Sequence, residues 1–321
     1  MEDEAVLELL SPSIGCFAVL DGHGGQFCSR WGAAELPRRL RKVAPSVERA
    51  SDDDEARVVA QLLSQTVQSM DADLRMRGRP AWACGSTLVT LLVTQRTLVV
   101  ANLGDSRAVL CRAGAALPLS RDHKPKSATE RQRILQAGGF ILDGRVNGDL
   151  SLSRALGDFR HKCVANLPPA RQPVSSEPDV RCTARLQADL FVVLACDGVW
   201  DVMSSADVIA LIASFLERAP CLEPPDHDDT IMERSTSAHV DDAASMMQLS
   251  AGDFPAAAAA VAADIKPQSC ECEPARINSD EQQRIAMSMI TERLLDECLR
   301  RGSTDNISAV IVILDPTLRP R

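Results

Sequence analysis

Four aspartates in this sequence, Asp21, Asp105, Asp197 and Asp305, each lie where an apolar segment meets a polar turn. Carboxylates gathered at strand ends repel one another, and their unpaired burial costs free energy. Divalent cations relieve that repulsion, and oxygen ligands without a Cys or His cluster favour Mg²⁺ or Mn²⁺ over Zn²⁺. Two ions sharing one carboxylate would lower the pKa of a water molecule, and the neighbouring His23 could protonate a leaving group. This set of residues predicts hydrolysis of a phosphate ester.

The first of these aspartates follows the apolar run 16–20, which we expect to be a buried strand because it is short and stopped by glycine. Such a strand would hold Asp21 rigidly at the edge of a cleft. Gly22 leaves its backbone carbonyl open to a cation, because no side chain crowds it. Asp-Gly is also an ordinary turn dipeptide, so Asp105 and Asp158 could be plain turn aspartates and His23 a turn histidine. The recurrence of strand, Asp and Gly at 189–198 favours the metal-binding interpretation.

The remaining pattern predicts the elements that position these residues. Helical spacing predicts helices over 26–42, over 54–77, over 205–215 behind a Ser204 cap, and over 285–299. A capping box formed by Ser127 and Glu130 is expected to open another short helix. The β-rich runs 87–94, 97–102 and 107–112 predict an antiparallel meander, and 189–195 and 307–314 predict further strands. The stretch 161–178 is expected to be an irregular surface loop.

Composition bounds the class of protein. The chain has 321 residues, 45% of them hydrophobic, and lacks tyrosine, so we expect an aliphatic core. A net charge of −9 argues against nucleic-acid binding. Its 11 cysteines are odd in number and follow no disulfide spacing, which favours reduced thiols, and Cys270 and Cys272 lack partners for a zinc site. We find no signal peptide and no membrane span, so we expect a cytoplasmic or nuclear protein. The sequence carries no signal of oligomeric state, and a monomer is the default expectation.

Acidity is concentrated in residues 220–282, which hold 13 Asp and Glu against three Lys and Arg. Low periodicity and proline-rich patches predict a disordered insertion with a transient helix around the alanines 256–260. One interpretation is a tolerated surface insertion, since loop closure entropy grows slowly with length. The alternative is a regulatory or docking segment for a basic partner.

Seven segments resemble the metal-dependent protein serine/threonine phosphatases of type 2C. They are FAVLDGHGG (17–25), CGSTLVTLLV (84–93), VANLGDSRAVLCR (100–112), LSRDHKP (119–125), NGDLSLSRALGDF (147–159), LACDGVWDVMS (194–204) and GSTDNISAVIV (302–312). The resemblance implies an α+β fold, a four-layer α/β/β/α sandwich with two central antiparallel β-sheets flanked by helices. We therefore expect a single phosphatase domain over 1–321, interrupted at about 220–282.

The resemblance also implies roles for individual residues. Two core Mg²⁺ or Mn²⁺ ions would be bridged by Asp21, with Glu2 and the Gly22 carbonyl on one side and Asp197 and Asp305 on the other. Asp105, with Asp197, would hold a weaker third ion. His23 would be the general acid, Asp201 and Asn306 would support metal-bound waters, and 161–180 would form a flap. Phosphoproteins would be the substrates, dephosphorylated by direct attack of metal-bound hydroxide without a phospho-enzyme.

Two features keep alternatives open. Relatives carry a strand and a phosphate-clamping arginine before Met-Glu-Asp, which here is the start of the sequence. We expect weaker metal binding through Glu2 and slower turnover, because a lost clamp costs about 2–4 kcal/mol of transition-state stabilisation; an incomplete start is the other explanation. A catalytically silent binding module is the rival function. Arg154 is either a phosphate contact or a structural ion-pair partner.

Overall fold

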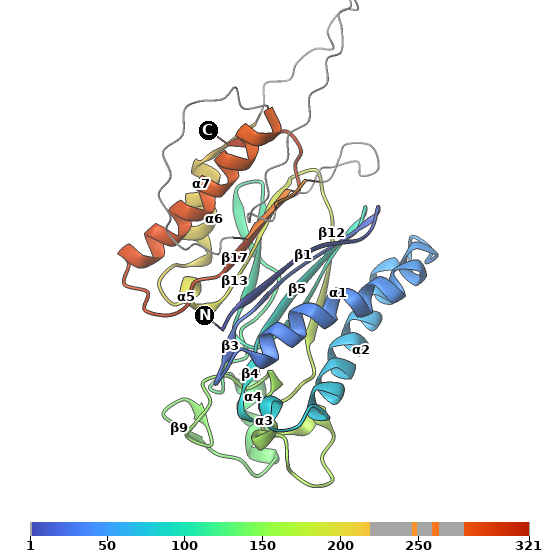
Figure 1. The fold of residues 1–321 in the computed structure, drawn as a ribbon, viewed down its shortest axis with the longest axis vertical. Helices are drawn as coiled ribbons and strands as arrows, with labels where there is room; N and C mark the ends of the chain where they lie inside the picture. The colour runs from blue at the N-terminus through green and yellow to red at the C-terminus, as the bar shows by residue number, and fades with distance from the viewer. Residues whose placement is uncertain (1, 219–245, 249–258, 263–278, 321) are drawn as a thin grey trace, which may run out of the picture.

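The computed structural model describes residues 2–218, 246–248, 259–262 and 279–320. Two antiparallel sheets lie face to face between two layers of helices (Figure 1). The first sheet has the strand order β1 (Glu4–Ser11), β2 (Ile14–Leu20), β5 (Leu88–Val93), β6 (Thr97–Leu103), β12 (Asp179–Ala184). The second has the order β15 (Met246–Gln248), β16 (Ala259–Ala262), β17 (Ala309–Ile313), β13 (Asp189–Ala195), β7 (Arg107–Arg112), β8 (Ala115–Pro118).

Helices cover the outer face of each sheet. On the first sheet α1 (Phe27–Glu48) contacts β1 and β2, and α2 (Glu55–Arg75) contacts β6 and β12. On the second sheet lie α5 (Asp197–Trp200), α6 (Ser205–Ser214) and α7 (Ser279–Arg300). The two helical layers are at opposite sides of the sheets (Figure 1). The expected four-layer α/β/β/α sandwich is therefore confirmed.

Strand β5 shows why the layers form. All six of its residues are buried, because both of its faces are covered. Successive side chains point to opposite faces of a strand. Leu88 and Leu92 accordingly join the core under α1 and α2, whereas Val89, Leu91 and Val93 join the core between the two sheets. An unbroken apolar run is therefore required here, and the few aromatic residues leave both cores aliphatic.

Short strands at one end of the sandwich hold the turns of the site. β3 (Gly22–His23) and β11 (Leu156–Gly157) both pair with β4 (Gly85–Ser86), and β3 and β4 lie together at the end of the sheets (Figure 1). Beyond them are α3 (Arg79–Ala83), α4 (Ala128–Gln136), the hairpin β9 (Ile141–Leu142) with β10 (Arg145–Val146), and the loop that leads to β12. That loop contains only two 3₁₀ turns, Phe159–His161 and Pro169–Arg171, which agrees with the expected irregular segment.

The predicted three-strand meander is wrong in its third strand. β5 and β6 pair as expected, but β7 pairs with β13 and β8 in the other sheet. The chain crosses between the sheets at Gly104, whose φ of 113° favours glycine, and Asp105. Strand periodicity does not specify which sheet a strand joins, so the local pattern could not reveal this crossing.

Three further expectations need correction. The capping box predicted at Ser127 is wrong: the Ser127 side chain makes no capping hydrogen bond, and the Glu130 carboxylate binds arginines instead of the helix start. The Ser204 cap is confirmed as a capping box with Asp207. Helix α7 begins at Ser279 rather than 285. Residues 259–262 of the alanine-rich stretch form strand β16, which pairs with the edge of β17, so the predicted helix is wrong there. Residues 246–248 form strand β15, so the predicted disordered insertion is also wrong at these positions. The other residues of 220–278, with Cys270 and Cys272, lie outside the described residues.

A membrane crossing needs a helix that is both long and apolar, and none of the described helices meets that requirement.

Candidate active site

Asp21 is fixed at the end of β2 by the neighbouring strand. Its backbone N–H donates to Thr87 Oγ1 at 3.0 Å, and its carbonyl accepts from the Thr87 N–H at 2.9 Å. The Thr87 hydroxyl also lies 2.7 Å from the hydroxyl of Ser106, in the turn that carries Asp105. One threonine therefore connects the two aspartate-bearing turns and sets their relative position.

Five aspartates converge on this point. Burial, followed by the negative charges of Asp3, Asp197, Asp105 and Asp305, raises the pKa of Asp21 to about 9. Burial and the charge of Asp105 likewise raise the pKa of Asp197 to about 6. Such shifts mean that burial and the neighbouring carboxylates together disfavour the charged forms of Asp21 and Asp197, which a bound cation would favour. The structure thus brings together the four aspartates singled out in the sequence, and it adds a fifth.

The fifth aspartate, Asp3, was missed in the sequence because it lies in a charged run that reads as a solvated terminus. It is buried, with 5% of its surface exposed, and its Oδ2 accepts a hydrogen bond from Ser308 Oγ at 2.7 Å. Its Oδ1 is buried without a hydrogen-bond partner in the described part of the protein. Burial raises the pKa of Asp3 despite the hydrogen bond from Ser308. Its position beside Glu2 in the acidic run was the available signal.

Glu2 and Gly22 form one compact contact. A Cβ on Gly22 would lie 2.3 Å from the backbone oxygen of Glu2 and 2.7 Å from Ser29 Oγ, so only glycine fits. The Ser29 hydroxyl donates a hydrogen bond to that same backbone oxygen. Helix α1 therefore holds Glu2 in place, and both Glu2 and Gly22 line the cleft.

Lys124 already supplies one positive charge to these carboxylates, a role that the sequence pattern did not indicate. Its Nζ donates to Asp105 Oδ2 at 2.5 Å and lies 3.7 Å from Asp197 Oδ2. Burial opposes the charge on Lys124, but Asp105 and then Asp197 hold its pKa above the ordinary value. Asp105 and Asp197 are thus neighbours, as a shared ion would require, and the lysine ammonium lies at their side.

The donor set fits a hard divalent cation. Within the described ranges no group of three or more His, Cys, Asp or Glu side chains is already close enough to form a closed metal cage. Asp3 Oδ1 nevertheless has no hydrogen-bond partner among the described residues, and the pKa of Asp21 is raised. Both observations indicate that these carboxyl groups lack a neighbouring positive charge. Carboxylate and carbonyl oxygens without thiolates are the ligands that Mg²⁺ and Mn²⁺ prefer.

His23 has a carboxylate partner, Asp158, which the sequence left as a turn residue. His23 Nε2 lies 2.7 Å from Asp158 Oδ2. Burial disfavours the imidazolium, but the hydrogen bond and charge of Asp158 hold the pKa of His23 above its ordinary value. Both side chains rest on Gly85, where a Cβ would come 2.1 Å from Asp158 Oδ2 and 2.5 Å from His23 Nε2. The His23–Asp158 pair therefore occupies the space that a side chain at position 85 would fill.

The residues expected to support metal-bound waters lie in two different places. Asn306 and Asp305 line the cleft, and the Asn306 N–H donates to Asp305 Oδ1 at 2.8 Å. A Cβ on Gly198 would lie 2.1 Å from the Asn306 backbone oxygen. The turn that carries Asp305 and Asn306 therefore packs directly against α5. Asp201 is exposed at the end of α5, where its charge contributes to the raised pKa of Asp197.

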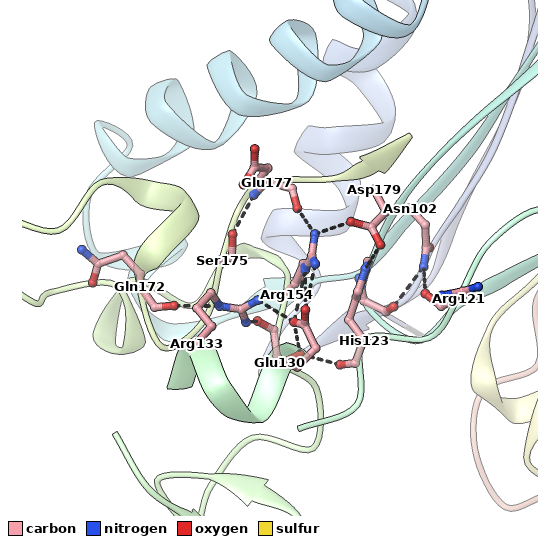
Figure 2. A network of polar contacts seen from close by, with 12 residues as sticks. Asn102, Arg121, His123, Glu130, Arg133, Arg154, Gln172, Ser175, Glu177 and Asp179 are labelled. Atoms are coloured by element: carbon pink, nitrogen blue, oxygen red, sulfur yellow. Dashed lines mark hydrogen bonds and ion pairs between the residues drawn. The ribbon is translucent and has the colours of Figure 1, made fainter. Parts of the chain in front are cut away.

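Arg154 is held in an ion-pair network, as Figure 2 shows. Its Nη2 lies 2.7 Å from Glu130 Oε1, and its Nη1 lies 2.7 Å from Asp179 Oδ1. His123, 3.2 Å from Asp179, accepts the Gly104 N–H at its Nδ1. These contacts favour the structural interpretation of Arg154: the network fixes the turn before Asp105, and the guanidinium is already engaged by carboxylates.

A different arginine reaches the cleft. The cleft has a volume of about 290 Å³, and its lining includes Glu2, Asp21, His23, Asp197, Asp305 and Arg145. Arg145 is exposed on the β9–β10 hairpin, where its Nη1 donates to the Asp149 carbonyl at 2.8 Å. It is the one Arg or Lys lining this cleft within the described part of the chain.

The sandwich and its acid-lined cleft define a class of protein, and the chain belongs to the protein phosphatase 2C family. The sequence model of that family, described as "Protein phosphatase 2C", matches residues 2–240.

Curated relatives agree with this assignment. "Probable protein phosphatase 1N" from Mus musculus is 43% identical over 231 residues, covering 70% of this chain and 55% of the relative. The protein of the same name from Homo sapiens is 45% identical over 208 residues, covering 64% and 47%. "Protein phosphatase 2C homolog 2" from Schizosaccharomyces pombe is 42% identical over 202 residues, covering 63% and 53%. The chain thus spans about half the length of these curated relatives.

Solved structures share the fold. A crystal structure of a phosphatase from a pathogenic strain of Toxoplasma gondii has a TM-score of 0.67 and 23% identity, covering 98% of this chain and 88% of that one. A Caenorhabditis elegans sex-determining protein has a TM-score of 0.65 and 24% identity, covering 98% of this chain and 62% of that one. These similarities support the sandwich architecture.

Proposed function

We propose that this protein hydrolyses phosphoserine and phosphothreonine in phosphoproteins, using Mg²⁺ or Mn²⁺. The convergence of five aspartates on one cleft, beside a histidine paired with a carboxylate, is the observation that carries this proposal. Membership in the phosphatase family supports the reaction class.

The metal ligands would be the oxygen donors of this cleft. Asp21, Glu2 and the Gly22 carbonyl would hold one ion, and Asp21, Asp197 and Asp305 a second. Asp105 with Asp197 would hold a weaker third ion, in competition with the Lys124 ammonium 2.5 Å from Asp105. Bound divalent cations supply Lewis acidity, which lowers the pKa of water and neutralises charge on a phosphate. Asp3, buried behind Asp21, would keep the ligand set negative.

His23 would protonate the departing serine or threonine oxygen. Because Nε2 faces Asp158, the nitrogen free to donate is Nδ1, which carries a proton in the imidazolium form. Asp158 favours that form by raising the pKa of His23. It also fixes the ring orientation, so Asp158 acts as a positioning residue.

Arg145 is the residue best placed to contact the substrate phosphate. Its guanidinium is exposed at the cleft and has no carboxylate contact among the interactions of the described residues. A guanidinium binds phosphate oxygens in a bidentate, charge-assisted manner. Arg154 cannot do so without giving up Glu130 and Asp179.

Hydrolysis of a phosphothreonine peptide with Mn²⁺ tests the proposal. We expect release of phosphate that stops on chelation and falls by at least 100-fold in Asp197→Asn. Asp53→Asn, an exposed loop substitution, is the matched control and keeps full activity. Hydrolysis that survives chelation would exclude metal dependence. Metal-loaded protein that binds phosphopeptide without cleaving it would support the rival function, a silent binding module.

A further inference from the structure

Two thiols from distant parts of the sequence lie side by side behind the active site. Cys28 is in the first turn of α1, and Cys84 lies between α3 and β4. Their Sγ atoms are 3.1 Å apart although 56 positions separate the residues. Both are buried, with 0% and 2% of their surfaces exposed. Neither takes part in the proposed hydrolysis.

The surroundings hold this pair in a fixed geometry. Cys28 Sγ donates to the Cys84 carbonyl at 3.4 Å, and Cys84 Sγ lies 3.1 Å from the Pro80 carbonyl. A disulfide has an S–S distance of about 2.05 Å, so the two sulfurs need to approach by only about 1 Å to bond. A small local movement of the 80–84 segment toward α1 achieves that approach.

Cys84 has the character of the more reactive thiol. Its hydrogen bond with Cys28 lowers the pKa of Cys84 to about 7 despite its burial. The thiolate is the nucleophilic form, so a substantial fraction of Cys84 is reactive near neutral pH. A Cβ on Gly25 would come 3.6 Å from the Cys84 Cβ, which places this cysteine against the half-buried Gly25, next to the exposed Gly24.

The pair also lies directly against the support of the His23–Asp158 pair. The Asp158 N–H donates to the Cys84 carbonyl at 3.0 Å, and Gly85, next in sequence, pairs with His23 in the β3–β4 ladder. On the other side, a Cβ on Gly157 would lie 2.6 Å from the Cys84 carbonyl and 2.7 Å from Cys28 Sγ. The Cys84 backbone is thus joined to Asp158 by a hydrogen bond and to Gly85 by a peptide bond.

We propose that Cys28 and Cys84 form a reversible disulfide on exposure to hydrogen peroxide, and that this disulfide switches the phosphatase off. The Cys84 thiolate attacks one peroxide oxygen; an S–O bond forms, the O–O bond breaks, and the departing hydroxide takes a proton to become water. Cys28 then attacks the sulfenic sulfur; the S–S bond forms, the S–O bond breaks, and the thiol proton leaves with the hydroxide as a second water. The two thiols supply the two electrons that reduce the peroxide.

The loss of activity rests on the proposed function, whereas formation of the bond does not. Approach of the two sulfurs displaces the Cys84 carbonyl and hence Asp158, so His23 loses its partner in the oxidised protein. A thiol reductant restores the original hydrogen bonds and the activity.

Peptide mapping of the full chain tests the bond independently of catalysis. Reduced protein is treated with hydrogen peroxide, its remaining thiols are alkylated, and it is digested without reduction. We expect a cross-linked peptide joining Cys28 to Cys84, within a monomeric chain on non-reducing electrophoresis. Stable sulfinic acid on Cys84, or a peptide that pairs either cysteine with another residue, would overturn the proposal.

Activity measured in parallel tests the switch. With Mg²⁺, whose oxidation state peroxide does not change, we expect at least a tenfold loss of phosphopeptide hydrolysis that dithiothreitol reverses. Cys28→Ala and Cys84→Ser should each resist peroxide, while Cys163→Ser and Cys182→Ser, which remove exposed thiols, should remain sensitive. A cross-link without loss of activity, or inactivation that persists in the two resistant variants, would disprove the switch. The cross-linked peptide from the unmutated chain decides the bond even if a variant folds poorly.

Discussion

His23 and Asp158 are bound to each other at 2.7 Å across 135 positions of sequence. The pair depends on Gly85, since any side chain there would occupy the space of both partners. Asp158 itself has a φ of 49°, which aspartate tolerates better than most residues. The local backbone is thus arranged to present one carboxylate to one imidazole.

Replacement of Asp158 by Asn tests this relationship. Loss of the carboxylate lowers the pKa of His23, so the protonated imidazole is lost at a lower pH than in the unmutated protein. We expect the alkaline limb of the kcat–pH profile to move to lower pH and kcat at pH 8 to fall by about 10- to 100-fold. Asp143→Asn is the control, because Asp143 is exposed and has the same φ of 49°. An unshifted profile would show that His23 is not the titrating acid.

Lys124 is expected to compete with a divalent ion for Asp105 and Asp197. In Lys124→Met, the affinity of the weakest Mn²⁺ site should increase by roughly tenfold, equivalent to about 1.4 kcal/mol. Isothermal titration with Mn²⁺ measures this change. Lys126→Met, an exposed substitution two residues away, should leave all affinities unchanged. Unchanged or weaker binding in Lys124→Met would mean that lysine and metal do not share this position.

Asp21 destabilises the metal-free protein, since its carboxylate faces four others. We expect Asp21→Asn to raise the Tm of chelator-treated protein by a few degrees while removing the stabilisation by Mn²⁺. In the unmutated protein, Mn²⁺ at a free concentration of about 100 times its Kd increases the free energy of unfolding by about 2.7 kcal/mol. Thermal unfolding with and without Mn²⁺ measures both effects, and Asp53→Asn serves as the control. A full Mn²⁺ shift in Asp21→Asn would remove Asp21 from the ligand set.

Glu130 stabilises the fold through Arg133 and Arg154. Burial opposes its charge, but these arginines lower the pKa of Glu130 from 4.5 to about 2, which corresponds to roughly 3 kcal/mol. Because the folded-state pKa is depressed, this stabilisation is present above pH 4.5 and is lost as the pH falls toward 2. Urea unfolding of Glu130→Gln should show a deficit of roughly 3 kcal/mol at pH 7 that narrows below pH 4.5. Glu177→Gln, whose side chain is exposed, should show no deficit at either pH.

Asp21, Asp105, Asp197 and Asp305 could be identified from the sequence because each lies where an apolar strand meets a polar turn, and that pattern is local. Asp3, Lys124 and Asp158 carry no such pattern. Their roles arise from contacts with Ser308, Asp105 and His23, which only the packed sandwich brings near. The same limit explains β7: its strand character was evident from its residues, whereas its partner sheet depends on a crossing at Gly104.

Asp3 near the start of the chain and Ser308 near its end share one hydrogen bond of 2.7 Å, and Glu2 and Asp305 face the same cleft. During synthesis, a ribosome-bound chain therefore holds Asp21 and its neighbours long before the residues around 305 have emerged. The nascent protein can fold its first sheet, but it cannot assemble the cleft. We therefore expect a chain interrupted before residue 302 to be inactive, however well the rest has folded, because it lacks Asp305.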